Sequence, residues 1–168
     1  CMKYFLEGYT ERINKVINRL KDEQVVERIW KKDFTVWNNK PDEISNRLGW
    51  LISPEVTAHS LTEIKNFVKE IRTEGFTHAL LMGMGGSSLA PEVFRFTFGV
   101  KEGYLDLAVL DTTDPDAILG IEKKLDPAKT LYIVSTKSGG TVETISFMKY
   151  FYNSVLKNLG KEKVSHHF

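Results

Sequence analysis

Residues 77–94, THALLMGMGGSSLAPEVF, decide the fold of this chain. An apolar run of strand length, residues 77–83, meets a glycine-rich turn and then a segment that can continue as a helix. Strands of a parallel sheet that is covered on both faces are continuously apolar, and a helix usually connects each to the next. This stretch therefore predicts the first strand, loop and helix of an α/β domain.

The same alternation recurs twice downstream. The two further strand and helix pairs are LDLAVLD at 105–111 with 114–125, and TLYIVS at 130–135 with 142–160. Three such pairs predict a doubly wound parallel sheet, in which ligands bind beyond the carboxyl ends of the strands. KVSHHF at 163–168 begins what we expect to be a fourth strand.

The amino-terminal third has a different pattern. From Phe5 to Leu20, apolar residues recur at intervals of three and four, which predicts an amphipathic helix. A later helix is expected from Leu61 to Gly75, where glycine favours termination. We expect residues 1–60 to be a helical extension and residues 61–168 to be the α/β domain, truncated at its carboxyl-terminal end.

Composition narrows the classes of partner. The 168 residues carry 23 basic and 22 acidic side chains, a formal charge of +1, without a basic run suited to nucleic acid or an anionic membrane. The single cysteine, Cys1, allows no disulfide within the chain, and neither a membrane span nor a signal peptide is recognisable. We expect a cytoplasmic protein whose partners are small molecules or like subunits.

The loop after the third strand is suited to phosphate. Hydroxyl donors, a lysine and two glycines precede a helix whose first N–H groups and positive dipole end favour an anion. The residues expected to hold the anion are Thr136, Lys137, Ser138, Gly139, Gly140 and Thr141. The alternative is that Ser138 or Thr141 simply caps the helix, which accounts for one hydroxyl and leaves the others unexplained.

The loop after the first strand, GMGGSS at 83–88, allows two interpretations. It approaches the dinucleotide-binding fingerprint, with Ser88 where glycine or alanine is required and Asp111 as the acid a ribose needs. Asp111 also fits a simple turn at the end of its strand. If both loops hold one ligand, this loop contacts the hydroxyls of a sugar through Gly85, Gly86, Ser87 and Ser88.

Together, GMGGSSLAPEVF and STKSGGTVET resemble the sugar isomerase (SIS) domain of glucose-6-phosphate isomerases, a flavodoxin-like fold. That family's two loops read G-x-G-G-S and S-K-[ST]-x-[TG]-T-x-E-T, and their order and spacing are specific. Upstream, RIWKKDFTVW and ISNRLGWL resemble the segment ahead of this domain in bacterial bifunctional transaldolase/glucose-6-phosphate isomerases. The resemblance covers essentially the whole chain.

The resemblance implies isomerisation of glucose 6-phosphate to fructose 6-phosphate through an enediol, without metal or cofactor. It assigns Thr136, Lys137, Ser138 and Thr141 to the phosphate, and Gly86 with Ser87 to the sugar. The family's glutamate base, histidine and arginine have no match here, so the catalytic residues are unknown, and the four histidines are expected to be structural.

We therefore expect a phosphohexose-binding portion of an isomerase that does not turn over alone, with a homodimer or a second SIS domain as its protein contact. Two other classes stay open. A regulatory SIS module would bind phosphosugars without catalysis, and an NAD-dependent oxidoreductase would bind a dinucleotide.

Overall fold

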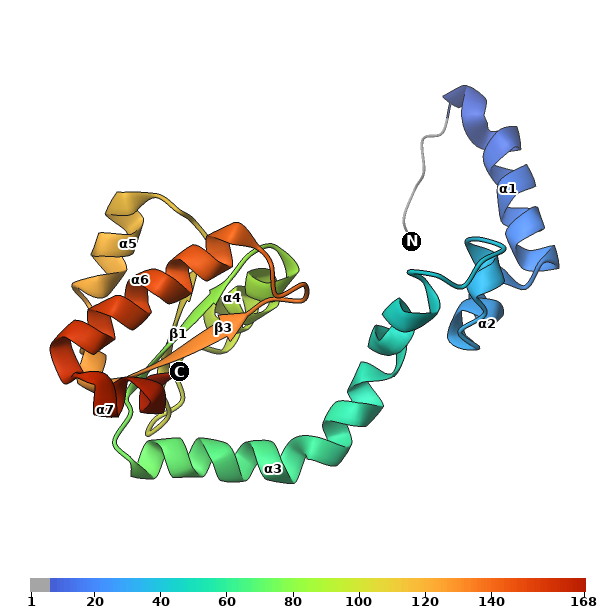
Figure 1. Ribbon diagram of the computed structural model, residues 1–168. Coiled ribbons are helices and arrows are strands. Elements are labelled where there is room, and N and C mark those ends of the chain that lie inside the picture. The colour runs from blue at the N-terminus through green and yellow to red at the C-terminus, as the bar shows by residue number, and fades with distance from the viewer. Residues whose placement is uncertain (1–6) are drawn as a thin grey trace. The chain divides into compact units, whose positions relative to one another are not determined.

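The computed structural model describes residues 7–168. The chain divides into two compact units, Cys1–Thr62 and Glu63–Phe168, coloured blue to green and green to red in Figure 1. Helix α3, Ser53–Thr73, runs through the boundary between them. Within residues 7–168, no helix has both the length and the apolarity that crossing a bilayer requires.

The amino-terminal unit is helical. Its elements before α3 are a 3-10 turn at Glu7–Tyr9, α1 at Thr10–Asp22, α2 at Val25–Trp30, and 3-10 segments at Phe34–Val36 and Ser45–Ile52. Part of the predicted first helix, from Phe5, lies outside the described residues. The helix predicted from Leu61 begins earlier, at Ser53, because Pro54 fits the first turn, where a backbone N–H would have no partner.

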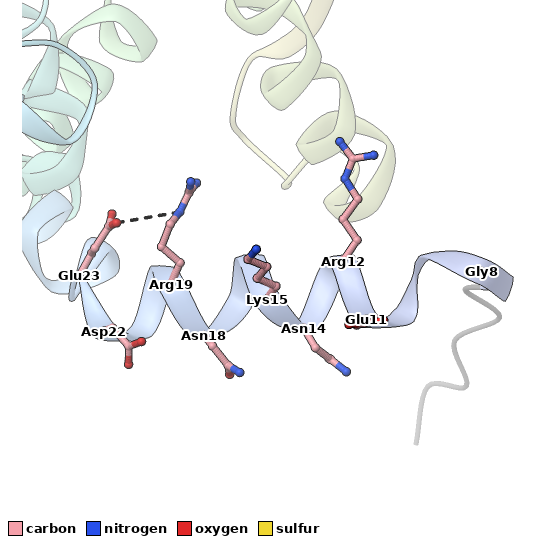
Figure 2. Close-up of a pocket in the computed structure, with 9 residues that line it drawn as sticks. All are labelled: Gly8, Glu11, Arg12, Asn14, Lys15, Asn18, Arg19, Asp22 and Glu23. Carbon is pink, nitrogen blue, oxygen red and sulfur yellow. Dashed lines mark ion pairs between the residues drawn. The ribbon is translucent and has the colours of Figure 1, made fainter.

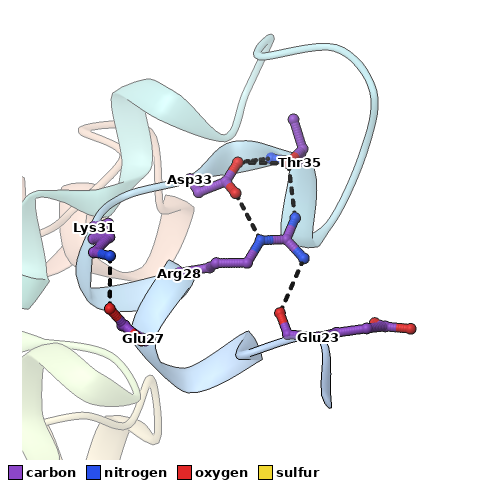
Figure 3. Close-up of polar contacts among 6 residues, drawn as sticks. All are labelled: Glu23, Glu27, Arg28, Lys31, Asp33 and Thr35. Atoms are coloured by element: carbon purple, nitrogen blue, oxygen red, sulfur yellow. Dashed lines mark hydrogen bonds and ion pairs between the residues drawn. The ribbon is translucent and has the colours of Figure 1, made fainter. Parts of the chain in front are cut away.

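Arg28 fastens the end of α2 to the turn that follows it (Figure 3). Its Nε donates to Asp33 Oδ2 at 2.8 Å, and its second guanidinium nitrogen donates to Thr35 Oγ1 at 2.9 Å. The Thr35 hydroxyl and the Arg28 guanidinium both stabilise the Asp33 carboxylate and lower its pKa to about 2. These contacts stabilise a local turn.

The second unit is built on a parallel sheet. Its strands are β1 at His78–Gly83, β2 at Asp106–Leu110 and β3 at Thr130–Ser135, in the spatial order β2-β1-β3. The helices that follow them are α4 at Gly86–Phe98, α5 at Pro115–Glu122 and α6 at Val142–Leu159. The predicted α/β fold with a parallel sheet is confirmed, and the order 2-1-3 is that of the flavodoxin-like class.

The core lies between the sheet and α5 with α6, while α4 packs on the opposite face (Figure 1). Side chains alternate along a strand, so Leu80 and Met82 of β1 point to the α6 side, whereas Ala79 and Leu81 point to the α4 side. The buried cluster comprises Leu80, Met82, Leu110, Tyr132, Phe147, Phe151, Val155 and Val164. Helices on both faces hold the carboxyl ends of the strands in a fixed arrangement.

The carboxyl-terminal residues correct one prediction. Residues 163–168 do not begin a strand, because Gly160, with φ of +84°, ends α6 and the chain continues as α7, Lys161–Val164, and a 3-10 turn. The buried His167 places Nδ1 2.9 Å from the carbonyl oxygen of Thr130, and Phe168 stacks on Tyr132 with ring centroids 5.0 Å apart. These apolar and polar contacts tie the segment to the beginning of β3.

Candidate functional site

The two glycine-rich loops leave the sheet side by side. β1 and β3 are parallel neighbours, and their last residues, Gly83 and Ser135, are partners in the register. A Cβ at Gly83 would lie 2.9 Å from the Ser135 carbonyl oxygen and 3.1 Å from Cβ of Ser87. Only glycine lets the two strand ends and the turn approach this closely.

In the loop from β1 to α4, Ser87 lines a cleft whereas Ser88 is buried. Gly85 has φ of +56° and ψ of −122°, a conformation that side-chain-bearing residues rarely adopt, and it immediately precedes α4. The buried Ser88 hydroxyl donates to the Gly85 carbonyl oxygen at 3.0 Å. Ser88 therefore stabilises the turn from inside, while Gly86 and Ser87 lie at its open side.

A cleft of about 630 Å³ lies between the two loops. Its volume falls within the range of small-molecule sites. The residues that line it are Met84, Gly86, Ser87, Ser135, Thr136, Lys137, Ser138, Thr141 and Thr144. Of these described residues, six carry a hydroxyl group, one is a lysine and none is acidic.

The amino-terminal end of α6 is uncapped and opens on this cleft. Thr141 occupies the N-cap position, yet its side chain makes no capping hydrogen bond. By contrast, Asp114 caps α5 by accepting from the Ala117 N–H at 2.9 Å. The alternative that Ser138 or Thr141 serves as a plain cap is therefore wrong, and the N–H groups of the first turn of α6 keep their capacity to donate.

The hydroxyls of the β3–α6 loop are held only by long contacts. Thr141 Oγ1 lies 3.4 Å from Thr136 Oγ1 and 3.3 Å from Ser138 Oγ. The N–H groups of Gly139 and Gly140 donate to Thr136 Oγ1 and Ser138 Oγ, both at 3.3 Å. Such weak bonds can be exchanged for stronger, charge-assisted bonds to an anion.

The electrostatics of the cleft favour negative charge. Lys137 is exposed and forms no ion pair with a carboxylate among residues 7–168. Glu143, in the first turn of α6, is not among the residues that line the cleft. One ammonium group, a helix amino terminus and several hydroxyls therefore act together without a competing anion.

Most of the predicted site residues line the cleft, and the others lie outside its lining. Those lining the cleft are Gly86, Ser87, Thr136, Lys137, Ser138 and Thr141, and those outside it are Gly85, Ser88, Gly139 and Gly140. Among the described residues, the four histidines and Asp111 are also absent from the lining. Sequence reasoning missed Met84, Ser135 and Thr144, although Thr144 ends the T-x-E-T pattern of the loop and could have been noticed there.

A second hollow, of about 820 Å³, lies along α1 in the amino-terminal unit (Figure 2). It is lined by side chains of α1 and its immediate flanks, between Gly8 and Glu23. Three of them are basic and three acidic, and Arg19 and Glu23 form a loose ion pair at 3.9 Å. The balanced charges of one exposed helix surface do not define a ligand, so the cleft at β1 and β3 is the candidate site.

The chain is similar in sequence to glucose-6-phosphate isomerases. The chain is 34% identical over 125 residues to glucose-6-phosphate isomerase of Thermus thermophilus, covering 73% of this chain and 28% of that protein. It is 29% identical over 140 residues to glucose-6-phosphate isomerase of Candida glabrata, covering 77% of this chain and 24% of that protein. The chain thus spans about a quarter of the length of these relatives.

A solved structure has a similar fold. The crystal structure of a hypothetical protein from Thermus thermophilus superposes with a TM-score of 0.60 and 28% sequence identity, covering 96% of this chain and 35% of that one. The family model described as phosphoglucose isomerase matches residues 34–168, which include both loops of the cleft. This chain therefore belongs to the phosphoglucose isomerase family.

Proposed function

We propose that this chain supplies the phosphate-binding part of an enzyme that interconverts glucose 6-phosphate and fructose 6-phosphate. The observation that carries the proposal is the uncapped amino terminus of α6, which opens on the same cleft as Lys137 and a cluster of hydroxyls. A phosphomonoester carries nearly two negative charges at neutral pH and three strong acceptor oxygens. The ammonium group, the first-turn N–H groups and the hydroxyls match that charge and that demand for donors.

The loop from β1 to α4 would contact the sugar. Ser87 lies in the wall of the cleft opposite the β3–α6 loop, and Gly86 leaves space for the ligand to approach the backbone. A hydroxyl can both donate and accept, as recognition of a sugar hydroxyl requires. The phosphate would thus fix one end of the hexose, and Ser87 would orient the portion nearest to it.

The cleft offers groups for binding and none for proton transfer. Aldose–ketose isomerisation moves a proton between C2 and C1, and its base must reach the carbon-bound hydrogen. Within residues 7–168, the lining of the cleft includes neither a carboxylate nor an imidazole. We therefore infer that this chain alone binds the phosphosugar and does not isomerise it.

The same observation favours a second candidate, a regulatory module that senses phosphosugars without catalysis. The two differ in the intact protein, because an isomerase would turn over and a regulator would not. A dinucleotide oxidoreductase receives less support, since Asp111 is exposed at the end of β2 and does not line the cleft.

Calorimetric titration tests the proposal. We expect gluconate 6-phosphate to bind this chain, inorganic phosphate to bind more weakly and NAD not to bind. A coupled assay on the same sample is expected to show no isomerisation. NAD binding in place of phosphosugar binding would contradict the proposal, and turnover would show that this chain itself supplies a catalytic base.

We also propose that α4 makes a protein contact, through a second copy of this chain or a second SIS domain. Large apolar side chains are exposed along it, namely Leu89, Val93, Phe94, Phe96 and Phe98. Exposed apolar clusters of this kind are typical of protein interfaces. Their burial in a complex would remove this surface from water.

A further inference from the structure

Thr144 is the one fully buried side chain with an unpaired polar atom within residues 7–168. The side chain is 1% exposed, and its Oγ1 has no hydrogen-bond partner. It occupies the third position of α6, after Val142 and Glu143, and it lines the cleft. Buried hydroxyls without a partner are uncommon and costly, so this one requires an explanation.

Within residues 7–168, the two other buried serine and threonine side chains have paired hydroxyls. The Ser88 Oγ donates to the Gly85 carbonyl oxygen at 3.0 Å, and the Thr130 Oγ1 donates to the Asp126 carbonyl oxygen at 2.7 Å. Both side chains are 0% exposed, so burial as such does not deprive a hydroxyl of its partner in this fold. The missing hydrogen-bond partner of Thr144 is therefore specific to its position at the cleft.

The helical position also removes the usual local partner. Within helices of this chain, Thr73, Thr97 and Ser146 each donate to the carbonyl oxygen four residues earlier. For Thr144 that residue is Gly140, which lies in the β3–α6 loop ahead of the helix, and no bond to it is formed. Valine would fill the same space without an unpaired hydroxyl, so packing alone does not require threonine.

We propose that the Thr144 hydroxyl is a further specificity-determining group of the phosphate site, unpaired in the empty cleft and paired when a phosphate group binds. The inference rests on the proposed function, because it takes the anion to lie at the amino terminus of α6. A change of the Thr144 side chain to another staggered rotamer would turn the hydroxyl toward the cleft, whose wall Thr144 already forms. The unpaired hydroxyl costs free energy in the empty protein, and a ligand that accepts a hydrogen bond from it removes this cost and is thereby preferred.

The test compares Thr144→Val, which keeps the shape and removes the hydroxyl, with Thr144→Ser, which keeps the hydroxyl. Ser146→Ala is the matched control, because Ser146 is on the same helix, is exposed and, within the described residues, donates its hydroxyl only to the Val142 carbonyl oxygen. For each variant, thermal unfolding without ligand and calorimetric affinity for gluconate 6-phosphate and inorganic phosphate are measured.

We expect Thr144→Val to melt at or above the wild-type temperature without ligand and to bind both ligands about tenfold more weakly. Thr144→Ser should keep the affinity within about threefold, and Ser146→Ala should leave it unchanged. Unaltered affinity in Thr144→Val, or a lower melting temperature of that variant without ligand, would overturn the inference. If the wild type binds neither ligand, the proposed function fails first and this inference fails with it.

Discussion

Removing the Lys137 ammonium should weaken phosphosugar binding by about 2 kcal/mol. Lys137 lines the cleft, and no carboxylate among residues 7–168 pairs with it, so its charge is available to the ligand. A single positive charge about 4 Å from a group of charge −2 gains roughly 2 kcal/mol in water-like surroundings. The exposure of Lys137 places it near that limit, which corresponds to roughly a 30-fold rise in Kd.

Titration of Lys137→Ala with gluconate 6-phosphate, at low salt and at about 0.5 M salt, measures this loss. Because the contact is exposed, the difference between wild type and variant should shrink as salt screens it. Lys149→Ala is the matched control, since Lys149 is an exposed lysine on α6 that does not line the cleft. Equal affinity of Lys137→Ala and wild type at low salt would refute the electrostatic reasoning.

Three other predictions concern packing, pH and association. Gly83→Ala should lower the melting temperature by several degrees, because the new Cβ would meet the Ser135 carbonyl oxygen. Thermal unfolding measures the change, and an unchanged melting temperature would refute this prediction. Burial, together with the nearby carboxylates, raises the pKa of the Tyr132 hydroxyl to about 12 in the folded chain. As the pH rises, the unfolded chain therefore loses the hydroxyl proton of Tyr132 before the folded chain does. The free energy of unfolding of the wild type should therefore fall by up to about 2 kcal/mol between about pH 10 and 12. Denaturant titration across this pH range should show a smaller fall for Tyr132→Phe, which has no hydroxyl to ionise. Phe98→Glu should reduce self-association in sedimentation, and a wild type that stays monomeric at high concentration would count against an α4 interface.

Local chemistry accounts for the predictions that the structure confirms. Continuous apolar runs define the three strands, and the periodicity of the following segments defines the helices, so the α/β fold with a parallel sheet was predictable. Two boundaries were wrong for reasons that local patterns do not express. Proline interrupts the interior of a helix, but Pro54 is accommodated in the first turn of α3. Residues 163–168 form helical turns because Val164 and His167 are buried there.

In the candidate site, too, some features follow from local sequence and others depend on the fold. The amino-acid sequence by itself determined which loops are rich in glycine and hydroxyl groups, because these residue types serve turns and anions through local geometry. Their place after predicted parallel strands also led us to expect both loops at one site. Only the tertiary structure decided that β1 and β3 are direct neighbours, so that the pairing of Gly83 with Ser135 brings together two loops about fifty residues apart. Tertiary packing also buried the hydroxyls of Ser88 and Thr144, of which Ser88 has a hydrogen-bond partner and Thr144 has none. The sequence does not show this difference, because burial depends on neighbours that are distant in the sequence.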